Sequence, residues 1–376
     1  MKKKTTAVVI RPENRPPFRP GAGGAIMAAV RTSLPTGTAA GKRVAGLAVC
    51  LALASCAVRC GPDAKEAAPA AKAAPARTAA QAAGGDTALG CLDGGRAFAH
   101  VERLISFGSR HVGTPGIERA RGWILQTLEG YGLSPRRHDF EARTPHPELA
   151  RVPMANISVD LPAAPKADQR AGTVLVGGHF DGKILPDGEP FYGANDGGSS
   201  TGLLLEMARC LAKHPPPVPV RLVWFDGEEA LVEWGDADGL YGSKHMAAEL
   251  KGSGEHERIA AVVIVDMIGD ARLRIQRERL STDWVRAALD RSASRLGHAE
   301  LMRGRPMAVE DDHVPFQRIG IPAAVLIDLR LGPGWESNAY WHTRRDDLSR
   351  ISTESLRAVG RIVIGALPEL AAGPPG

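Results

Sequence analysis

Two short stretches of this chain carry residues that could do chemistry. In the first, Glu228 and Glu229 follow an apolar run over residues 220–225 that is typical of a buried strand. Neighbouring residues on an extended segment point in different directions, so one carboxylate can bind a metal while the other faces a substrate as a base. The second stretch contains Trp341 and His342, near the C-terminus. A histidine from a distant loop can complete a metal site, so the pattern indicates a metal-dependent enzyme, with zinc as the best fit.

Three further candidate ligands follow apolar runs or lie in a glycine-rich loop. They are His179 after the run 174–176, Asp196 in the segment GANDGG, and Asp266 at the end of the run 262–265. Carboxylate and imidazole together suit Zn²⁺, and the absence of a thiolate from the set argues against a structural zinc site. Each residue alone has an ordinary explanation as a turn, capping or surface residue. Their recurrence at the ends of buried strands favours a single functional site at one edge of a sheet.

The elements that must position these residues alternate between strand and helix signals from about residue 91 to residue 372. Strands are predicted at 156–160, 173–179, 220–225, 259–266 and 323–329. Helices are predicted at 97–107, 118–131, 200–213, 241–250, 283–296 and 353–370, the last with Ser352 as its N-cap. Strands that alternate with helices predict an α/β fold with a largely parallel, helix-covered sheet.

The first 90 residues are predicted to be a leader and a tether. Residues 41–43 are a positively charged start, and residues 44–55 form an apolar run that is too short to span a bilayer. The sequence LASC ends at Cys56 and resembles a bacterial lipoprotein cleavage box. We therefore expect a signal at 1–55, whose true start can be Met27, and a lipid anchor at Cys56 in the bacterial cell envelope or periplasm. An ordinary secretory signal is the alternative.

Composition separates this leader from the rest of the chain. Residues 56–90 are rich in Ala and Pro and lack periodicity, which predicts a disordered tether before a catalytic domain at 91–376. The net charge is +5, but much of the excess lies in the first 43 residues, and no basic helix with interleaved aromatics is visible. We expect no nucleic-acid partner, a monomer, and membrane contact only through the lipid anchor. Cys91 and Cys210 can pair in an oxidising compartment, although the sequence does not establish that they do.

The predicted catalytic domain resembles the zinc-dependent M28 peptidase superfamily, and within it the glutaminyl-peptide cyclotransferases (glutaminyl cyclases). The resemblance runs from the FGSR segment at 107–110 to the last helix. His179-Phe180-Asp181 is similar to the His-X-Asp motif of the superfamily. The segments similar to the cyclase pattern are DGEEA at 226–230, LYGSKH at 240–245, DDHVPF at 311–316 and WHT at 341–343. The resemblance implies a three-layer sandwich with a mostly parallel central sheet flanked by helices.

The same resemblance implies roles for individual residues. Three side chains would bind one catalytic Zn²⁺ ion: Asp196, Glu229 and His342. Three would serve proton transfer and its supporting acidic network: Glu228 as the proton shuttle, with Asp266 and Asp311. Two would line the substrate pocket: Trp234 and Trp341. The implied reaction converts the N-terminal glutamine of a peptide or protein to pyroglutamate and releases ammonia.

An M28-type zinc aminopeptidase is the alternative, because such enzymes resemble this chain at the same positions. They use two zinc ions, so Asp196 would bridge the pair while His179 and Asp266 hold the second ion. Glu228 would then activate a water that attacks the first peptide bond. All of these ligands are present, so they do not separate hydrolysis from cyclisation.

Some positions depart from the animal cyclase pattern and leave the substrate open. Val325 stands where those enzymes carry a histidine, and the segment 331–338 before Trp341 is longer. A zinc-binding lipoprotein without catalysis is disfavoured because Glu228 is present. A serine hydrolase is disfavoured because the chain carries GGSS at 197–200 instead of a Gly-X-Ser-X-Gly elbow.

Overall fold

The computed structural model describes residues 87–165, 167, 171–329 and 339–374, and most strands within these ranges form one large sheet. Its six strands lie in the order β1-β2-β4-β3-β5-β8. Their bounds are β1 (Arg136–Arg143), β2 (Arg151–Leu161), β3 (Thr173–His179), β4 (Val220–Phe225), β5 (Ile259–Asp266) and β8 (Ala323–Ile327). β3 is parallel to β4 and β5, and β5 is parallel to β8, whereas β2 is antiparallel to β1 and β4. The sheet is therefore mostly parallel, with an antiparallel edge.

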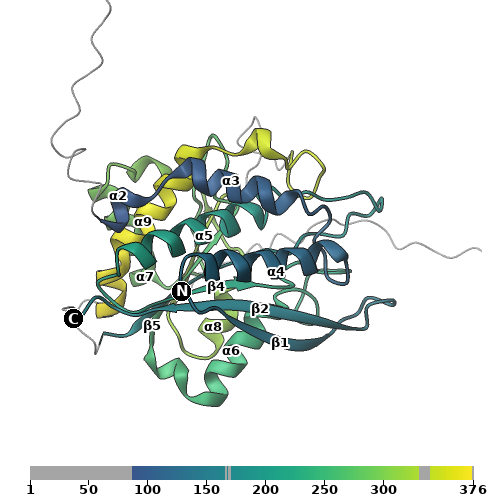
Figure 1. Ribbon diagram of the computed structural model, residues 1–376, viewed down its shortest axis with the longest axis horizontal. Helices are drawn as coiled ribbons and strands as arrows, with labels where there is room; N and C mark the ends of the chain where they lie inside the picture. The colour runs from purple at the N-terminus through teal and green to yellow at the C-terminus, as the bar shows by residue number, and fades with distance from the viewer. Residues whose placement is uncertain (1–86, 166, 168–170, 330–338, 375–376) are drawn as a thin grey trace, which may run out of the picture. The chain divides into compact units, whose positions relative to one another are not determined.

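Helices cover both faces of this sheet (Figure 1). On one side lie α2 (Ala88–Cys91), α3 (Gly94–Ile105), α4 (Pro115–Gly130), α5 (Gly198–Lys213), α7 (Asp283–Arg295) and α9 (Thr353–Ala372). On the other side lie α6 (Tyr241–Ser253) and α8 (His313–Arg318). Short elements complete the described chain: β6 (Arg277–Glu278) paired with β7 (Pro306–Met307), and 3-10 turns at Glu255–Arg258, Ala299–Met302 and Leu348–Arg350. The predicted three-layer α/β sandwich is confirmed.

The apolar runs of the central strands are explained by this double coverage. Val174 and Val176 of β3 belong to the larger core cluster, which contains α3, α4, α5 and α9. Leu175 between them belongs to the cluster on the α6 and α8 side. Because neighbouring strand residues point to opposite faces and both faces are covered, every position of such a strand is buried and apolar.

Local capping signals fix where several helices begin. The Thr114 hydroxyl accepts a hydrogen bond from the backbone N–H of Ile117, and Pro115 occupies the first turn of α4. Ser352 caps α9 in the same way through the N–H of Ser355, as predicted. Each such cap stabilises its helix by about 1 kcal/mol.

The sequence analysis missed the antiparallel edge. β1 was not predicted, because most of its side chains are exposed and charged and it therefore lacks an apolar run. The strand predicted at 156–160 extends over Arg151–Leu161. The short helix α8 was also not predicted, and α2 begins at Ala88, before the predicted domain boundary at Cys91.

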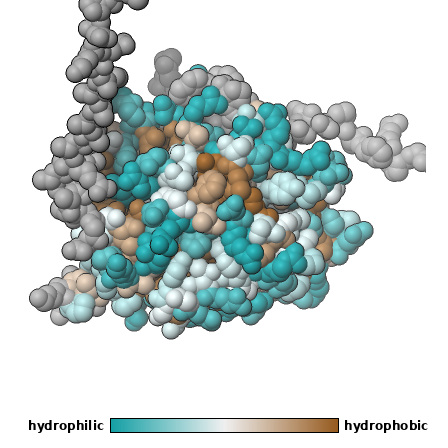
Figure 2. Space-filling view, turned by 45° about the horizontal axis from the view of Figure 1, so that its top comes forward, coloured by the Kyte–Doolittle hydropathy of each residue, from teal (hydrophilic) through white to brown (hydrophobic). Residues whose placement is uncertain are grey.

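Several predictions fall on residues that the structure does not describe. The predicted signal at 1–55, the anchor at Cys56, almost all of the tether and the segment 331–338 lie outside the described ranges. Within those ranges, no helix is both long and apolar enough to cross a membrane. Hydrophilic residues cover most of the face seen in Figure 2, apart from an apolar area near its centre.

A disulfide joins Cys91 of α2 to Cys210 of α5. The two Cα atoms are 5.6 Å apart, and the cysteines are separated by 119 residues in the sequence. The guanidinium of Arg209 donates to both sulfur atoms at 3.2 Å. The bond fastens the first described helix to the long helix that follows the Asp196 loop.

Reduction of this disulfide should lower the thermal midpoint of unfolding. The reduced unfolded chain regains the freedom of a loop of more than 100 residues, which is worth at most about 5 kcal/mol. We expect a fall of at least several degrees in thermal unfolding followed by circular dichroism with and without reductant. A double variant, Cys91→Ser with Cys210→Ser, should have the thermal midpoint of the reduced protein, and reductant should not change it. A wild-type midpoint that does not respond to reductant would contradict this expectation.

Candidate metal centre and active site

The predicted site residues meet at the carboxyl ends of the parallel strands. His179 is the last residue of β3 and Asp266 is the last residue of β5. Glu228 follows the end of β4 by three residues, and Asp196 lies in the loop before α5. His342 comes from the segment after β8. Parallel α/β sheets place their ligand sites at this edge, because loops from several strands converge there.

Asp196, Glu229 and His342 form the first group of candidate metal ligands. His342 Nε2 lies 3.4 Å from Asp196 Oδ2 and 3.3 Å from Glu229 Oε1. Both of these carboxylate oxygens are buried and have no hydrogen-bond partner among the described residues. One imidazole nitrogen and two unpartnered carboxylate oxygens fit a zinc ion, with a coordination position left open for a substrate. The ligand roles themselves remain predictions.

His179, Asp196 and Asp266 form a second group that shares Asp196 with the first. His179 Nε2 lies 3.1 Å from Asp196 Oδ1 and 3.2 Å from Asp266 Oδ1. The other ring nitrogen, Nδ1, lies 3.3 Å from Asp181 Oδ1. Asp196 thus belongs to both groups, and its bridging role stays a prediction.

Asp181 fixes the turn that carries the two glutamates. Its carboxylate accepts hydrogen bonds from the backbone N–H groups of Glu228, at 3.0 Å, and Glu229, at 3.2 Å. Gly227 precedes them with φ +68°, and a Cβ there would lie 2.6 Å from the sulfur of Met154. The chain therefore turns sharply after β4, and the two glutamate side chains leave it in different directions.

Negative charge dominates this edge of the sheet. The buried carboxylic acids of the described chain that gather there include Asp181, Asp196, Glu228, Glu229, Asp266, Asp311, Asp312 and Asp346. The positively charged groups that act on them are Arg110, Lys183 and the two histidines. Buried anions are costly without a partner, so the site favours either protonation or a bound cation.

The pKa values of the ring and carboxyl groups reflect this crowding. Burial alone would lower the pKa of His342, but the charge of Glu229 and the contacts with Asp196 raise it to about 9. Burial raises the pKa of Glu228 well above its usual value; His179 opposes this shift and Glu229 adds to it. Burial likewise raises the pKa of Asp311, and the charge of Asp266 adds to the shift. Glu228 is thus a carboxyl group that readily holds a proton.

Lys183 is a charged neighbour that the sequence analysis missed. Its ammonium lies 3.4 Å from Glu229 Oε2 and donates to the carbonyl oxygen of Ala230 at 2.8 Å. Burial would lower its pKa, but the charges of Glu229 and Glu228 outweigh burial and raise it. Lys183 lies two residues after Asp181 in the His-X-Asp segment, and that position was the only signal for it in the sequence.

The predicted acidic network is buried, and its two adjacent candidates remain close to each other. Asp311 Oδ1 accepts from the N–H of Asp312 at 2.5 Å. Burial raises the pKa of Asp312 to about 7, and the charges of Asp181 and Asp266 add to the shift. Val325, in place of the expected histidine, is fully buried in the core on the α6 and α8 side.

Trp341, one of the two predicted pocket residues, lies against a candidate metal ligand. The Trp341 ring stacks on His342 with ring centroids 4.0 Å apart, and His342 has a left-handed backbone with φ 51°. Phe191 presents its edge to the same imidazole at 6.1 Å. Aromatic side chains therefore bound His342 on two sides and orient its ring.

Trp234 lies on a loop that closes back onto Glu228. A Cβ on Gly239 would come within 3.2 Å of both the Trp234 ring and the Glu228 carbonyl oxygen. The buried carboxylate of Asp238 accepts from the backbone N–H groups of Leu231, Val232 and Glu233 at 2.7–2.9 Å. The Tyr241 hydroxyl donates to Asp238 at 2.8 Å. This carboxylate, which the sequence analysis missed, holds the loop in place.

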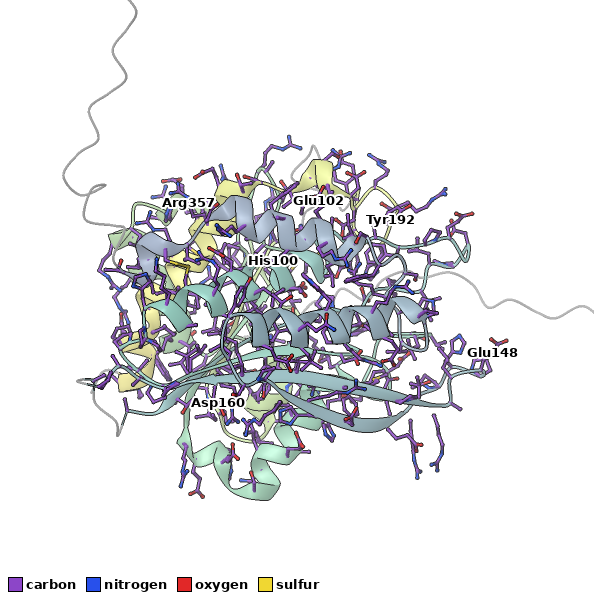
Figure 3. The ribbon with its side chains drawn as sticks, in the orientation of Figure 1. His100, Glu102, Glu148, Asp160, Tyr192 and Arg357 are labelled. Atoms are coloured by element: carbon purple, nitrogen blue, oxygen red, sulfur yellow. A yellow bond between two sulfur atoms is a disulfide. The ribbon has the colours of Figure 1, made fainter. Side chains whose placement is uncertain are left out.

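Apolar side chains near the site remain accessible. Tyr192 is 38% exposed and Val232 is 59% exposed. Tyr192, labelled in Figure 3, follows Phe191 in the loop before Asp196, and Val232 lies in the loop of Trp234. These side chains offer apolar surface beside the candidate site.

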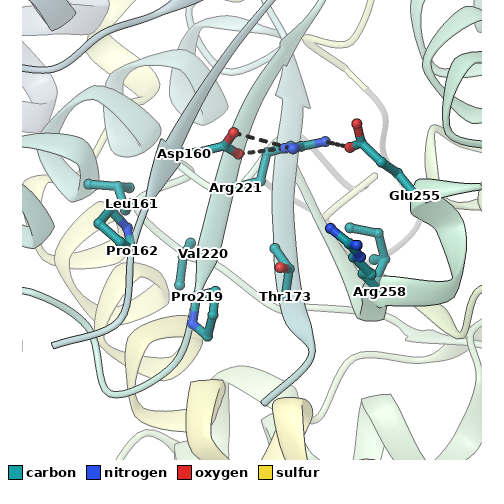
Figure 4. Close-up of a pocket in the computed structure, with 10 residues that line it drawn as sticks. Asp160, Leu161, Pro162, Thr173, Pro219, Val220, Arg221, Glu255 and Arg258 are labelled. Atoms are coloured by element: carbon teal, nitrogen blue, oxygen red, sulfur yellow. Dashed lines mark hydrogen bonds and ion pairs between the residues drawn. The ribbon is translucent and has the colours of Figure 1, made fainter. Parts of the chain in front are cut away.

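A separate cavity of about 300 Å³ lies at the opposite edge of the sheet (Figure 4). It is lined by the starts of the parallel strands, at Thr173, Val220 and Ile259. Arg221 beside it is paired with Asp160 at 2.6 Å and with Glu255 at 2.9 Å. None of the predicted site residues lines this cavity, so it is distinct from the candidate active site.

Comparison with known proteins places this geometry in a family. Residues 156–367 match the family described as Peptidase family M28. The glutaminyl-peptide cyclotransferase-like protein of Bos taurus is 28% identical over 289 residues, which are 69% of this chain and 72% of that protein. The glutaminyl cyclase of an Acidobacteriales bacterium has a TM-score of 0.69 and 32% identity, covering 82% of this chain and 99% of that one. For the glutaminyl cyclase of Porphyromonas gingivalis, the TM-score is 0.64, the identity 28%, and the coverage 74% and 99%.

The matched segment includes all of the candidate ligands and more than half of the 376-residue chain. The structural match to the Acidobacteriales protein extends over nearly the whole of that chain. The chain belongs to peptidase family M28.

Proposed function

We propose that this protein is a zinc-dependent glutaminyl cyclase, which converts the N-terminal glutamine of peptides or proteins to pyroglutamate and releases ammonia. The observation that carries the proposal is a nearly buried Glu228, 8% exposed, beside the Asp196, Glu229 and His342 group. The names of the relatives and of the similar solved structures support the same activity.

Asp196, Glu229 and His342 would hold the zinc ion. When bound, zinc supplies a Lewis acid that polarises the γ-carboxamide of the substrate. The α-amine attacks the carbonyl carbon of the side-chain carboxamide in the same residue, so the substrate itself brings the reacting atoms together. Glu228 takes the proton that the attacking nitrogen loses and delivers it to the departing amide nitrogen, which leaves as ammonia.

The neighbouring residues serve this proton transfer. Asp266 and Asp311 are buried with Glu228, and their mutual repulsion favours keeping a proton within the group. The rings of Trp341 and Trp234 lie beside His342 and beside the backbone of Glu228. We propose that they form apolar walls that exclude water, which would otherwise compete with the amine for the carbonyl carbon of the carboxamide.

An aminopeptidase is the second candidate, and a specific observation favours it. His179, Asp196 and Asp266 form a second potential metal group, which a two-zinc hydrolase would need. In that case Glu228 would deprotonate a water instead of an amine. The number of zinc ions and the nature of the nucleophile thus separate the two candidates.

We propose an extracytoplasmic location, with a lipid anchor at Cys56 as the finer possibility. The Cys91–Cys210 disulfide supports an oxidising compartment, because such bonds are rare in the cytosol. The leader and the anchor lie outside the described residues, so this part of the proposal rests on the sequence. A monomer acting on peptide N-termini remains the expected form.

The reaction can be tested by mass spectrometry of a Gln-initiated peptide. We expect zinc-dependent loss of one ammonia from an otherwise intact peptide, and no reaction after chelation. The same peptide with N-terminal leucine is the control and should remain unchanged. Release of free glutamine or leucine would instead establish the aminopeptidase.

Substitution of the proposed proton shuttle should stop turnover without removing the metal. Glu228→Gln keeps the shape of the side chain but cannot cycle a proton, so we expect kcat to fall by at least about 100-fold. Zinc content, measured by atomic absorption, should equal that of the wild type. Turnover near the wild-type rate would remove Glu228 from the mechanism.

Substitution of the proposed imidazole ligand should weaken zinc binding. His342→Ala leaves two carboxylates where zinc needs at least three protein ligands, so we expect substoichiometric metal after dialysis. His245→Ala on α6 is a matched control, because that ring stacks on Phe140 and belongs to neither ligand group. Stoichiometric zinc in the His342→Ala protein would exclude this residue as a ligand.

A further inference from the structure

One buried carboxylate at the site has no part in the proposed reaction. Asp346 is fully buried, four residues after His342. Its Oδ1 accepts from the backbone N–H of Asn195 at 2.8 Å, and its Oδ2 accepts from the N–H of Asp196 at 3.0 Å. Both oxygens are thus engaged by main-chain donors, so Asp346 is not placed to be a metal ligand.

The main chain of Asp346 adds a third bond to the same loop. Its carbonyl oxygen accepts from the N–H of Ala194 at 3.2 Å. Three consecutive N–H groups, of Ala194, Asn195 and Asp196, therefore end on one residue that lies 150 positions away in the sequence. This connection ties the backbone of one proposed zinc ligand to the segment that carries another.

The Asp346 end of this connection is continuous with His342. The N–H of Asp346 donates to the carbonyl oxygen of Thr343 at 3.1 Å, and the N–H of Thr343 donates to that of Tyr340 at 3.2 Å. His342 lies inside these turns. The guanidinium carbon of Arg350 lies 3.8 Å from the centre of the Tyr340 ring and so packs against this segment. A shift of Asp346 would therefore move the imidazole.

The opposite side of the Asp196 loop is held by a buried cation. Arg110 is fully buried and donates to the carbonyl oxygens of Phe180, Tyr192 and Gly193 at 2.6–3.1 Å. Gly193 has φ +53°, and a Cβ there would lie 2.5 Å from the Asp196 carbonyl oxygen. Carbonyl groups of the loop thus accept hydrogen bonds from Arg110, while its N–H groups donate to Asp346.

We propose that Asp346 is a positioning residue of the metal centre, which sets the separation of Asp196 and His342 before any metal binds. The inference rests on the proposed ligand set, because it concerns the geometry of two of its members. Partners behind metal ligands typically change metal affinity by about 10- to 100-fold when they are altered.

The test is the zinc dissociation constant of metal-stripped protein, measured by competition with a chromophoric chelator. Asp346→Asn keeps one acceptor oxygen but places an NH₂ group opposite the other backbone N–H. Two donors cannot bond to each other, so one hydrogen bond is lost and the loop should move away from His342. We expect the dissociation constant to rise by about 10- to 100-fold. Zinc binding equal to that of the wild type would overturn the proposal.

Glu206→Gln is the matched control. Glu206 is also buried, lies on α5 beyond the Asp196 loop, and accepts a backbone N–H from the distant Asp93 at 2.9 Å. It should lower the thermal midpoint of the metal-free protein, as Asp346→Asn does, yet leave zinc affinity unchanged. An equal loss of zinc affinity in both variants would reduce the role of Asp346 to general stability and overturn the proposal.

Two further outcomes are distinguishable. If wild-type protein does not bind zinc, the proposed function fails and the inference fails with it, whereas normal wild-type binding confines any failure to Asp346. If Asp346→Asn does not fold, amide hydrogen exchange of the wild type decides the matter. The amides of Asn195 and Asp196 should be protected already in the metal-free protein, and protection that arises only with zinc would overturn the proposal.

Discussion

The carboxylate of Asp196 lies between two imidazoles, with one oxygen 3.1 Å from His179 Nε2 and the other 3.4 Å from His342 Nε2. This shared contact joins three segments of the chain that lie far apart in the sequence. His179 ends β3 at the centre of the sheet, while His342 arrives from the segment after β8 at the sheet edge. Only a fold that brings the carboxyl ends of its parallel strands together can make three such distant segments meet at one carboxylate.

The charge gathered around that contact explains why so many backbone N–H groups point into the site. Asp181, Asp238 and Asp346 each accept two or three main-chain N–H bonds from a loop. A carboxylate can be buried when such donors satisfy it, and in return it fixes the loop that supplies them. Asp196 and Glu229 each keep a buried oxygen without a hydrogen-bond partner, and both belong to a group of candidate metal ligands. Some carboxylates thus hold loops in place, while others of the same chemical type are available to bind a metal.

The central part of the fold was predictable because a strand that is buried on both faces appears in the sequence as an apolar run. The strands that carry His179, Glu228 and Asp266 are continuous apolar runs, and their predicted bounds agree with the structure. The edge strand β1 has no such run, since one of its faces is exposed and the other is only partly buried. The predicted ligands come together for the same reason: each is adjacent to a strand end or belongs to a recognisable motif.

The supporting residues were beyond sequence reasoning, because their contacts depend on the folded chain. Asp346 and Arg110 act on the Asp196 loop from sites far away in the sequence, and no spacing links them to it. Lys183 approaches Glu229 across two separate loops. A charged residue in a loop is exposed far more often than it is buried, so only the structure distinguishes these from their solvated neighbours.

The choice between cyclisation and hydrolysis depends on what surrounds the ligands and not on the ligands themselves. Both reactions need a Lewis acid and a carboxyl group that can hold a proton, and the proposed roles of Asp196, Glu229, His342 and Glu228 would serve either. Hydrolysis also needs a water at the open coordination position, whereas cyclisation requires that water be kept from the reacting carbon. The rings of Trp341 and Phe191 lie against His342, and the Trp234 loop, which Asp238 holds in place, packs against the backbone of Glu228. Under the proposed function these aromatic side chains, more than the metal ligands, would keep water from the reacting carbon and so decide between the two reactions.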